Sequence, residues 1–230
     1  MKICGIMKLT LLDFPEKTAC TIFTGGCNFV CPFCHNASLV VRANEQQIIP
    51  EEEILSFLSK RTGLLDGVCI TGGEPLLQPD IEDFIKKIRS LGFLVKLDTN
   101  GSFPDKLKSV VNKGLVDYVA MDIKSSPENY GKVIGVDNFD IAPVRESVEF
   151  LIGGNVDYEF RTTLVSELHD ENDIVKIGQW INGANKYFLQ NFVDSGDIIG
   201  SNFTAFSKDK MLYFKDILKK YVNHVEIRGL

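Results

Sequence analysis

Three cysteines, Cys27, Cys31 and Cys34, lie within eight residues of one another at the spacing C-x3-C-x2-C. They directly follow the strand-like run 19–24 and a Gly-Gly turn, so one short loop presents all three thiols. Three thiolates on one loop suit three corners of an iron–sulfur cube, whose fourth corner is normally held by a fourth Cys. Because no fourth Cys is nearby, one iron would keep an open position that can bind a substrate or a cofactor.

Other interpretations fit parts of this loop. Cys31 to His35 spells C-x-x-C-H, the pattern of covalent haem attachment, but that interpretation leaves Cys27 unused. A redox dithiol of the C-P-x-C kind needs only two thiols. A zinc site built from the three cysteines and His35 is a further alternative, although structural zinc usually has a second C-x2-C-like pair, which is missing. Clustering in one loop argues against incidental core thiols, so the iron–sulfur interpretation is favoured.

The composition is that of a single globular domain, 1–230. Of the 230 residues 44% are hydrophobic and 24% are charged, which is ordinary for a protein with a full core. The net charge of −6 argues against a nucleic-acid partner, which calls for a basic face. No stretch approaches the roughly 20 apolar residues of a membrane span. The first residues lack the apolar core of a secretory signal, so we expect a cytoplasmic protein whose six cysteines serve metal or redox chemistry rather than disulfides.

After the Cys loop, strand-like and helix-like segments alternate along the chain. Such repeated units predict a parallel sheet with right-handed crossovers and outer helices. The count of six or seven strands is below the eight that close a barrel, so the fold class is α/β, either a partial barrel of the (β/α)6 type or an open sheet. The polar segments 125–138 and 193–206 are expected to be loops. The further predicted strands are 67–71, 93–99, 116–123, 157–165, 187–192 and 222–227.

Residues suited to ligand binding follow several of these strands at their carboxyl ends, where ligands sit in α/β sheets. Glycines allow close approach of backbone where a Cβ would obstruct, and two acids at adjacent strand ends would be costly to bury unpaired. One pocket accounts for all of these residues. Besides the Cys loop they are Gly72, Gly73, Glu74, Asp98, Thr99, Asp122 and Lys124.

The same residues carry a family resemblance. The Cys loop, with Phe33 before its last Cys, and the segment 71–75 (TGGEP) resemble the two motifs of the radical S-adenosylmethionine (SAM) superfamily. The continuation Cys34-His35-Asn36, with LDTNG at 97–101 and MDIK at 121–124, resembles the glycyl-radical-enzyme activating proteins. Within that group, the segments 12–15, 160–163 and 226–229 of this chain resemble the activating proteins of anaerobic ribonucleoside-triphosphate reductase.

The resemblance implies a radical SAM core: a partial barrel with a [4Fe-4S] cluster on Cys27, Cys31 and Cys34, whose unique iron binds S-adenosylmethionine. One electron cleaves the sulfonium, and the resulting 5′-deoxyadenosyl radical takes a hydrogen atom from a glycine of a partner. The implied partners are a glycyl radical enzyme, in the first place an anaerobic ribonucleotide reductase, and a flavodoxin- or ferredoxin-like electron donor. A small-molecule enzyme similar to 7-carboxy-7-deazaguanine synthase, a pyruvate formate-lyase activase and a metal-stabilised binding module stay open as alternatives.

The resemblance also assigns residues. In the pyruvate formate-lyase activating enzyme the matching positions hold a monovalent cation, whose ligands here would be Asp98, Thr99, Asp122 and the carbonyl of Ala120. That enzyme has a cofactor-contacting His near the end of its sixth strand, whereas this chain has Gln190 and Asn191 there. Glu74 is expected to accept from the cofactor's ammonium group. The full set of expected cofactor contacts is Phe33, His35, Gly72, Gly73, Glu74, Asp98, Asp122, Lys124 and Arg161.

Overall fold

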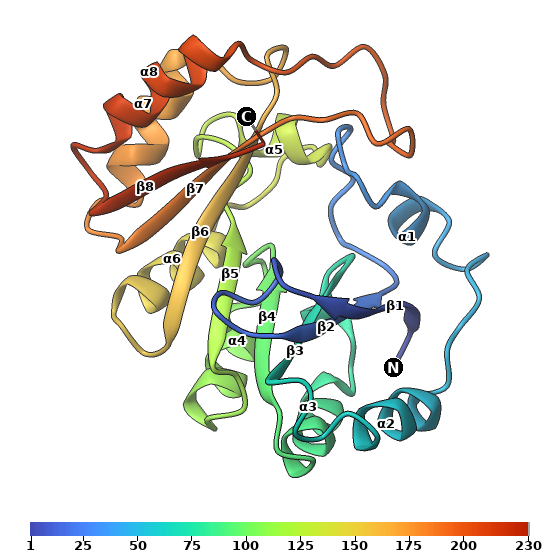
Figure 1. Cartoon of the computed structure of the whole chain (residues 1–230). Coiled ribbons are helices and arrows are strands. Elements are labelled where there is room, and N and C mark those ends of the chain that lie inside the picture. Colours follow the sequence, from blue (N-terminus) through green and yellow to red (C-terminus); the bar gives the residue numbers. More distant parts are fainter. Residues whose placement is uncertain (230) are drawn as a thin grey trace.

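One eight-stranded sheet runs through the computed structural model, which describes residues 1–229 (Figure 1). The strands pair in sequence order, so β1 and β8 stand at the two ends of the sheet. The pairs from β2 to β8 are all parallel, and β1 runs antiparallel to β2. The strands are β1 (Ile3–Thr10), β2 (Ala19–Thr24), β3 (Gly67–Gly72), β4 (Leu94–Thr99), β5 (Tyr118–Asp122), β6 (Asp157–Leu164), β7 (Lys186–Asn191) and β8 (His224–Arg228).

The predicted partial barrel with parallel strands and outer helices is confirmed, but the expected count of six or seven strands was too low, because the sheet has eight. β1 was missed because its pairing with β2 contains two register irregularities, between Ile3 and Gly5 and between Met7 and Thr10. Irregularities of this kind break the strict alternation by which a strand is recognised in a sequence.

Long helices follow most of the strands and cover the outside of the sheet (Figure 1). Their apolar residues form the main core together with the outward-facing residues of the strands. None of the helices among residues 1–229 has both the length and the apolar character needed to cross a membrane. The long helices are α2 (Glu51–Ser59), α3 (Ile81–Ser90), α4 (Pro104–Asn112), α6 (Ala142–Ile152), α7 (Glu171–Trp180) and α8 (Lys208–Leu218).

Two short helices, α1 (Ala37–Val41) and α5 (Tyr130–Ile134), lie in segments without a helical pattern in the sequence. The expectation of a loop over 125–138 was therefore wrong for its middle part. Five residues are too few to reveal a period, and α5 is defined by burial of Tyr130, Val133 and Ile134 in the core. The segment 193–206, all of it described, contains no helix or strand, as predicted.

The end of the barrel opposite the predicted site is closed by the segment after β1. Phe14 is buried against Ala19, Tyr118 and Leu94, which lie at the amino ends of three strands. A Cβ on Gly67 would lie 2.8 Å from the Phe14 ring, so the absence of a side chain at Gly67 makes room for this ring. The LDFP segment at 12–15 thus has a structural role at the floor of the barrel.

Candidate active site

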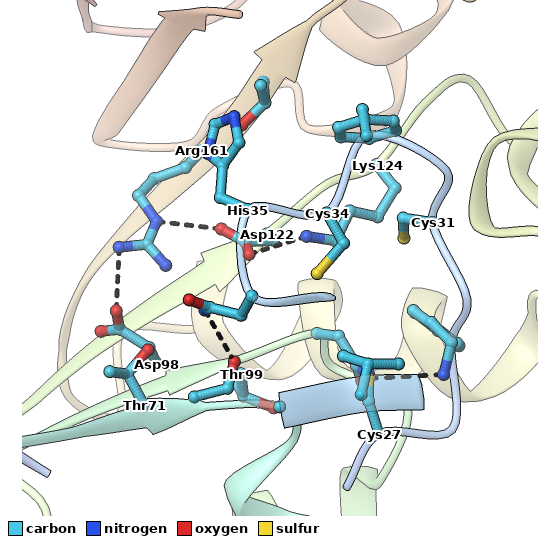
Figure 2. A pocket seen from close by; sticks show the side chains of 18 of the residues that line it. Cys27, Cys31, Cys34, His35, Thr71, Asp98, Thr99, Asp122, Lys124 and Arg161 are labelled. Atoms are coloured by element: carbon cyan, nitrogen blue, oxygen red, sulfur yellow. Dashed lines mark hydrogen bonds and ion pairs between the residues drawn. The ribbon is translucent and has the colours of Figure 1, made fainter. Parts of the chain in front are cut away.

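A pocket with about 930 Å³ of empty space, part of it open to solvent, lies at the carboxyl ends of the strands (Figure 2). Glu74 and Ala120 stand outside its lining. Gln190 lines it and accepts a hydrogen bond from Thr163 (3.3 Å), whereas the amide of Asn191 is bonded to the backbone of Phe206. The predicted residues that the pocket brings together are Cys27, Phe33, Cys31, Cys34, His35, Gly72, Gly73, Asp98, Thr99, Asp122, Lys124 and Arg161.

The Cys loop is held by backbone hydrogen bonds from elements that are distant in sequence. Val30 donates to the carbonyl of Ile134 at the end of α5 (2.9 Å), and Gly200 donates to the carbonyl of Pro32 (2.7 Å). Phe29 packs its ring against Phe139 with centroids 5.3 Å apart. These contacts fix the path of the Cys loop. The sequence did not predict that α5 and the segment 193–206 support it.

Three thiols of one loop line the same pocket, an arrangement that fits a metal cluster. None of the six cysteines forms a disulfide, and burial raises the pKa of Cys27 to about 11 and that of Cys31 to about 12. Bound iron would have to supply the charge that converts them to thiolates. Cys27 already accepts from the backbone N–H of Phe29 (3.4 Å) and from the amide of Asn100 (3.8 Å), which suits a charged sulfur.

Among residues 1–229, no three His, Cys, Asp or Glu side chains converge in the way that a single metal ion requires. The thiols of a cubic cluster bind three different irons, so they do not need to meet at one point. The Lys124 ammonium is paired with Asp122 (2.9 Å) and points into the same pocket as the thiols (Figure 2). Its charge acts to lower the pKa of Cys31, against the larger effect of burial.

Gly72 and Gly73 are required by the approach of protein backbone. A Cβ on Gly72 would lie 2.4 Å from the backbone nitrogen of Thr24, and one on Gly73 would lie 2.0 Å from the carbonyl oxygen of Gly26. Gly72 also has a φ of +115°, which side chains rarely tolerate. The expectation was close approach of a cofactor at these glycines. The structure adds a second reason, since they bring the end of β3 against the start of the Cys loop.

Glu74 ties two strand ends together beneath the pocket. Its buried carboxylate accepts from the backbone of Leu76 (2.9 Å), the hydroxyl of Thr99 (2.9 Å) and the backbone of Asn100 (2.7 Å). Burial raises its pKa to about 7, against the effect of these donors. The expected contact with a cofactor ammonium stays a prediction. The observed role is to join the turns after β3 and β4.

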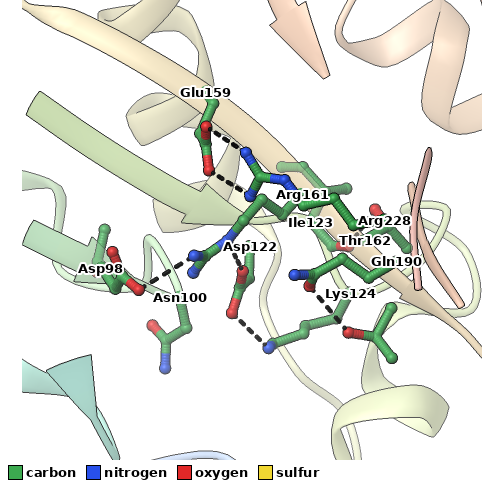
Figure 3. Close-up of polar contacts among 12 residues, drawn as sticks. Asp98, Asn100, Asp122, Ile123, Lys124, Glu159, Arg161, Thr162, Gln190 and Arg228 are labelled. Atoms are coloured by element: carbon green, nitrogen blue, oxygen red, sulfur yellow. Dashed lines mark hydrogen bonds and ion pairs between the residues drawn. The ribbon is translucent and has the colours of Figure 1, made fainter. Parts of the chain in front are cut away.

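Five charged side chains of alternating sign form a continuous chain, which we call the ion-pair chain: Lys96, Asp98, Arg161, Asp122 and Lys124. Figure 3 shows its last four members. Arg161 bridges both acids, with 3.0 Å from Nη1 to Asp98 Oδ2 and 2.9 Å from Nε to Asp122 Oδ1. Lys124 Nζ lies 2.9 Å from the other oxygen of Asp122, and Lys96 pairs with the other oxygen of Asp98. Burial alone would raise the pKa of both acids, but the neighbouring cations hold it below its usual range.

Lys96 was missed in the sequence, although it stands two residues before Asp98 on the same face of β4. The available signal was a lysine inside an otherwise apolar strand, Phe93 to Leu97. One layer below, Arg228 makes two hydrogen bonds to Glu159, of 3.0 and 3.1 Å (Figure 3). This pair fixes β8 to β6 and gives the segment 226–229 a structural role.

His35 and His169 both pack near the Cys loop, His35 against Phe192 and His169 against Phe33. The His35 ring stacks on Phe192 with centroids 5.7 Å apart, at the pocket wall. His169 is buried, and its two ring nitrogens bond the backbone N–H of Val165 (3.1 Å) and the carbonyl of Lys124 (2.8 Å). These two contacts with backbone give His169 a structural role.

Comparison with known proteins places this geometry in a family. The family model described as "Radical SAM superfamily" matches residues 21–181. The chain belongs to this superfamily. It is a radical SAM enzyme, and a [4Fe-4S] cluster and S-adenosylmethionine follow from membership in the family. The resemblance read from the Cys loop and the TGGEP segment is thereby confirmed.

Three similar proteins bear on the activity. "Putative glycyl-radical enzyme activating enzyme MJ1227" of Methanocaldococcus jannaschii is 31% identical over 235 residues, 99% of this chain and 96% of that protein. The 7-carboxy-7-deazaguanine synthase of Clostridium acetobutylicum is 30% identical over 148 residues, 63% of this chain and 64% of the synthase. A solved domain of pyruvate-formate lyase-activating enzyme from Bacteroides vulgatus has a TM-score of 0.58 at 20% identity, covers 71% of this chain and 99% of its own, and shows the shared fold.

Proposed function

We propose that this chain installs a glycyl radical on a partner enzyme by taking a hydrogen atom from a glycine of that partner. The observation that carries this function is the similarity over 99% of the chain to a relative named as a glycyl-radical enzyme activating enzyme. Anaerobic ribonucleoside-triphosphate reductase is the partner we propose first, because the segments 12–15, 160–163 and 226–229 resemble its activating proteins. A flavodoxin- or ferredoxin-like protein supplies the electron.

Cys27, Cys31 and Cys34 would hold three irons of a [4Fe-4S] cluster and leave the fourth for the amino and carboxylate groups of S-adenosylmethionine. Bound together, the two cofactors supply the one-electron chemistry that yields a 5′-deoxyadenosyl radical and methionine. Lys124 faces the Cys loop from across the pocket and offsets part of the thiolate charge. The ion-pair chain has three positive and two negative members, so it favours an anionic group such as the cofactor carboxylate.

The pocket wall also contains apolar side chains that keep water from a radical. Phe29, Phe33 and Val40 line the pocket, and the two aromatic rings are almost completely buried. Exclusion of water prevents side reactions of such an intermediate. The product of the transfer is 5′-deoxyadenosine, with the unpaired electron left on the glycine.

The test is a reconstitution under anaerobic conditions. The chain is loaded with iron and sulfide, reduced, and mixed with S-adenosylmethionine and an anaerobic ribonucleotide reductase. We expect the doublet of a glycyl radical by electron paramagnetic resonance, and its loss when the radical-bearing glycine of the reductase is replaced by Ala. Cleavage of S-adenosylmethionine without any radical on the reductase would refute the proposed partner.

A matched pair of cysteine variants controls the experiment. Cys31→Ala removes a thiol of the Cys loop, and we expect it to abolish 5′-deoxyadenosine formation. Cys20→Ala removes a buried thiol of the outer core and should leave product formation in place. Undiminished deoxyadenosine formation by Cys31→Ala would contradict the cluster assignment.

The partial match to 7-carboxy-7-deazaguanine synthase supports a second candidate, a radical enzyme for a small molecule. The two candidates differ in what consumes the radical. Turnover of a small heterocyclic substrate with no protein partner present would favour the second candidate, and a glycyl radical on a partner would favour the first.

A further inference from the structure

We propose that Lys96 is a built-in cation: it fills the role of the monovalent cation that the resemblance implied, so that S-adenosylmethionine binds to this chain without Na⁺ or K⁺. The inference concerns the cofactor pocket of the proposed function and depends on it only in taking S-adenosylmethionine as the ligand. Three observations support it: the expected ligand oxygens already have partners, the ion-pair chain has a net positive charge, and Lys96 is buried beside Asp98.

The side-chain oxygens expected to bind a monovalent cation, those of Asp98, Asp122 and Thr99, already have partners. Both carboxylate oxygens of Asp98 are paired, one with Lys96 and one with Arg161. Both oxygens of Asp122 are paired as well, with Arg161 and Lys124. The Thr99 hydroxyl donates to Glu74 (2.9 Å) and accepts from the backbone N–H of Gly101 (3.1 Å). The residues present therefore do not fit an additional cation.

The charge of the ion-pair chain argues in the same direction. Its three cations and two carboxylates leave a surplus of one positive charge. Asp98 and Arg161 are only 13% and 14% exposed, so interactions here are screened far less than at the surface. A further cation would raise the surplus of positive charge at a high desolvation cost. The negative carboxylate of S-adenosylmethionine would instead neutralise this surplus.

Lys96 does not line the pocket itself; it is buried behind Asp98, which does, and acts on the site through that acid. Its side chain is 2% exposed, and its ammonium bonds Asp98 and lies 3.9 Å from the sulfur of Cys69. Neighbouring strands place Cys69 and Tyr118 directly beside it in register. Removal of this ammonium would leave Asp98 with Arg161 alone and open a space next to the acid.

The experiment measures cofactor affinity and needs no partner protein. The reconstituted holoenzyme is dialysed against S-adenosylmethionine in tetramethylammonium chloride or in KCl at equal ionic strength. For the wild type we expect dissociation constants that agree within about twofold. For Lys96→Met we expect a loss of about tenfold or more in tetramethylammonium chloride, with recovery in KCl. Thallium-205 resonance, with Tl⁺ as the K⁺ probe, should detect a bound ion in the variant and none in the wild type.

Several outcomes would overturn the inference. They are a wild-type affinity that rises about tenfold with K⁺ or Na⁺, a Lys96→Met affinity equal to that of the wild type, and a loss in Lys96→Met that neither cation restores. The last result would show a lysine with a purely structural role. Lys96→Arg keeps the charge and should stay independent of K⁺.

Thermal unfolding establishes that each variant is folded. If Lys96→Met does not fold, the wild type and Lys96→Arg still decide the question, because a K⁺ requirement in either contradicts a built-in cation. These readouts are separate from the glycyl-radical assay. Cation-independent binding with no radical on the reductase would refute the proposed partner alone, and a glycyl radical formed only with K⁺ would refute the role of Lys96 alone.

Discussion

The two faces of the sheet differ in what stabilises them, although the same strands build both. Phe160 and Arg161 are neighbours on β6; Phe160 is fully buried, and the side chain of Arg161 is 14% exposed. Phe160 points outward into the apolar core beneath the helices, whereas Arg161 points inward and bridges Asp98 and Asp122. The outer face depends on buried area and shape, and the inner face depends on the pairing of charges.

This difference has consequences for substitution. An outward apolar residue can be replaced by another of similar volume at small cost, because packing is all it contributes. An inward charge cannot be removed alone, because its partner would be left buried and unpaired. Charged residues that face the barrel interior and apolar residues that face the core therefore alternate along these strands.

The largest expected effects separate the two faces on β6. Phe160→Ala should lower the free energy of unfolding by about 3–5 kcal/mol through the cavity it leaves, with S-adenosylmethionine affinity retained in the folded fraction. Arg161→Met should also destabilise by about 3–5 kcal/mol, since it leaves two acids with one fewer cation. In addition it should remove cofactor binding.

Chemical denaturation and equilibrium dialysis measure these two quantities. Arg161→Lys serves as a control that keeps the charge but loses the double bridge, and we expect intermediate affinity. Equal loss of cofactor affinity in Phe160→Ala and Arg161→Met would remove the distinction between the faces.

A smaller effect is expected where the two faces meet, at the turn after β4. Gly101 has a φ of +74°, and a Cβ there would lie 2.0 Å from the terminal methyl of Met121 on the outer face. Gly101→Ala should cost about 1–3 kcal/mol more than Gly92→Ala by overpacking. Gly92 is the matched control, because its φ of +90° imposes the same kind of strain with no atom within 4 Å.

The Gly101 turn also bears on the pocket, since Thr99 and Asn100 line it. We expect Gly101→Ala to weaken S-adenosylmethionine binding and Gly92→Ala to leave it unchanged. Comparable unfolding free energies for the two variants would show that Met121 moves aside freely.

The smallest effect concerns the pH dependence of stability. Burial lowers the pKa of His169 below 6.5, and backbone hydrogen bonds to Lys124 and Val165 offset only part of this shift. Below about pH 6.5 His169 gains a proton in the unfolded chain but not in the folded chain, so its contribution to the free energy of unfolding falls as the pH falls.

His169→Gln should flatten the fall in stability below about pH 6.5, as measured by urea unfolding at a series of pH values. His224→Gln, which changes an exposed ring on β8, is the matched control. An unchanged slope in His169→Gln would exclude His169 as its origin.

Much of the fold could be predicted, because its signals are local. The apolar patterns of 67–71 and 93–99 predict the strands β3 and β4, and the 3.6-residue period predicts the helices that follow them. The alternation of strands with helices predicts a parallel sheet. Elements without a period of their own could not be predicted. β1 is irregular, and α5 is short, so both are defined by what they pack against.

The candidate site followed the same division. The sequence by itself determined that three thiols share one loop and that Gly72, Asp98 and Asp122 stand at strand ends, since spacing along a strand or loop sets these positions. Only the tertiary structure decided the contacts between strands. Lys96 and Arg161 form ion pairs with Asp98, and backbone atoms of the neighbouring loop leave no room for a Cβ at Gly72 or Gly73. Such contacts depend on strand register and on the path of distant loops, and neither leaves a local pattern in a single sequence.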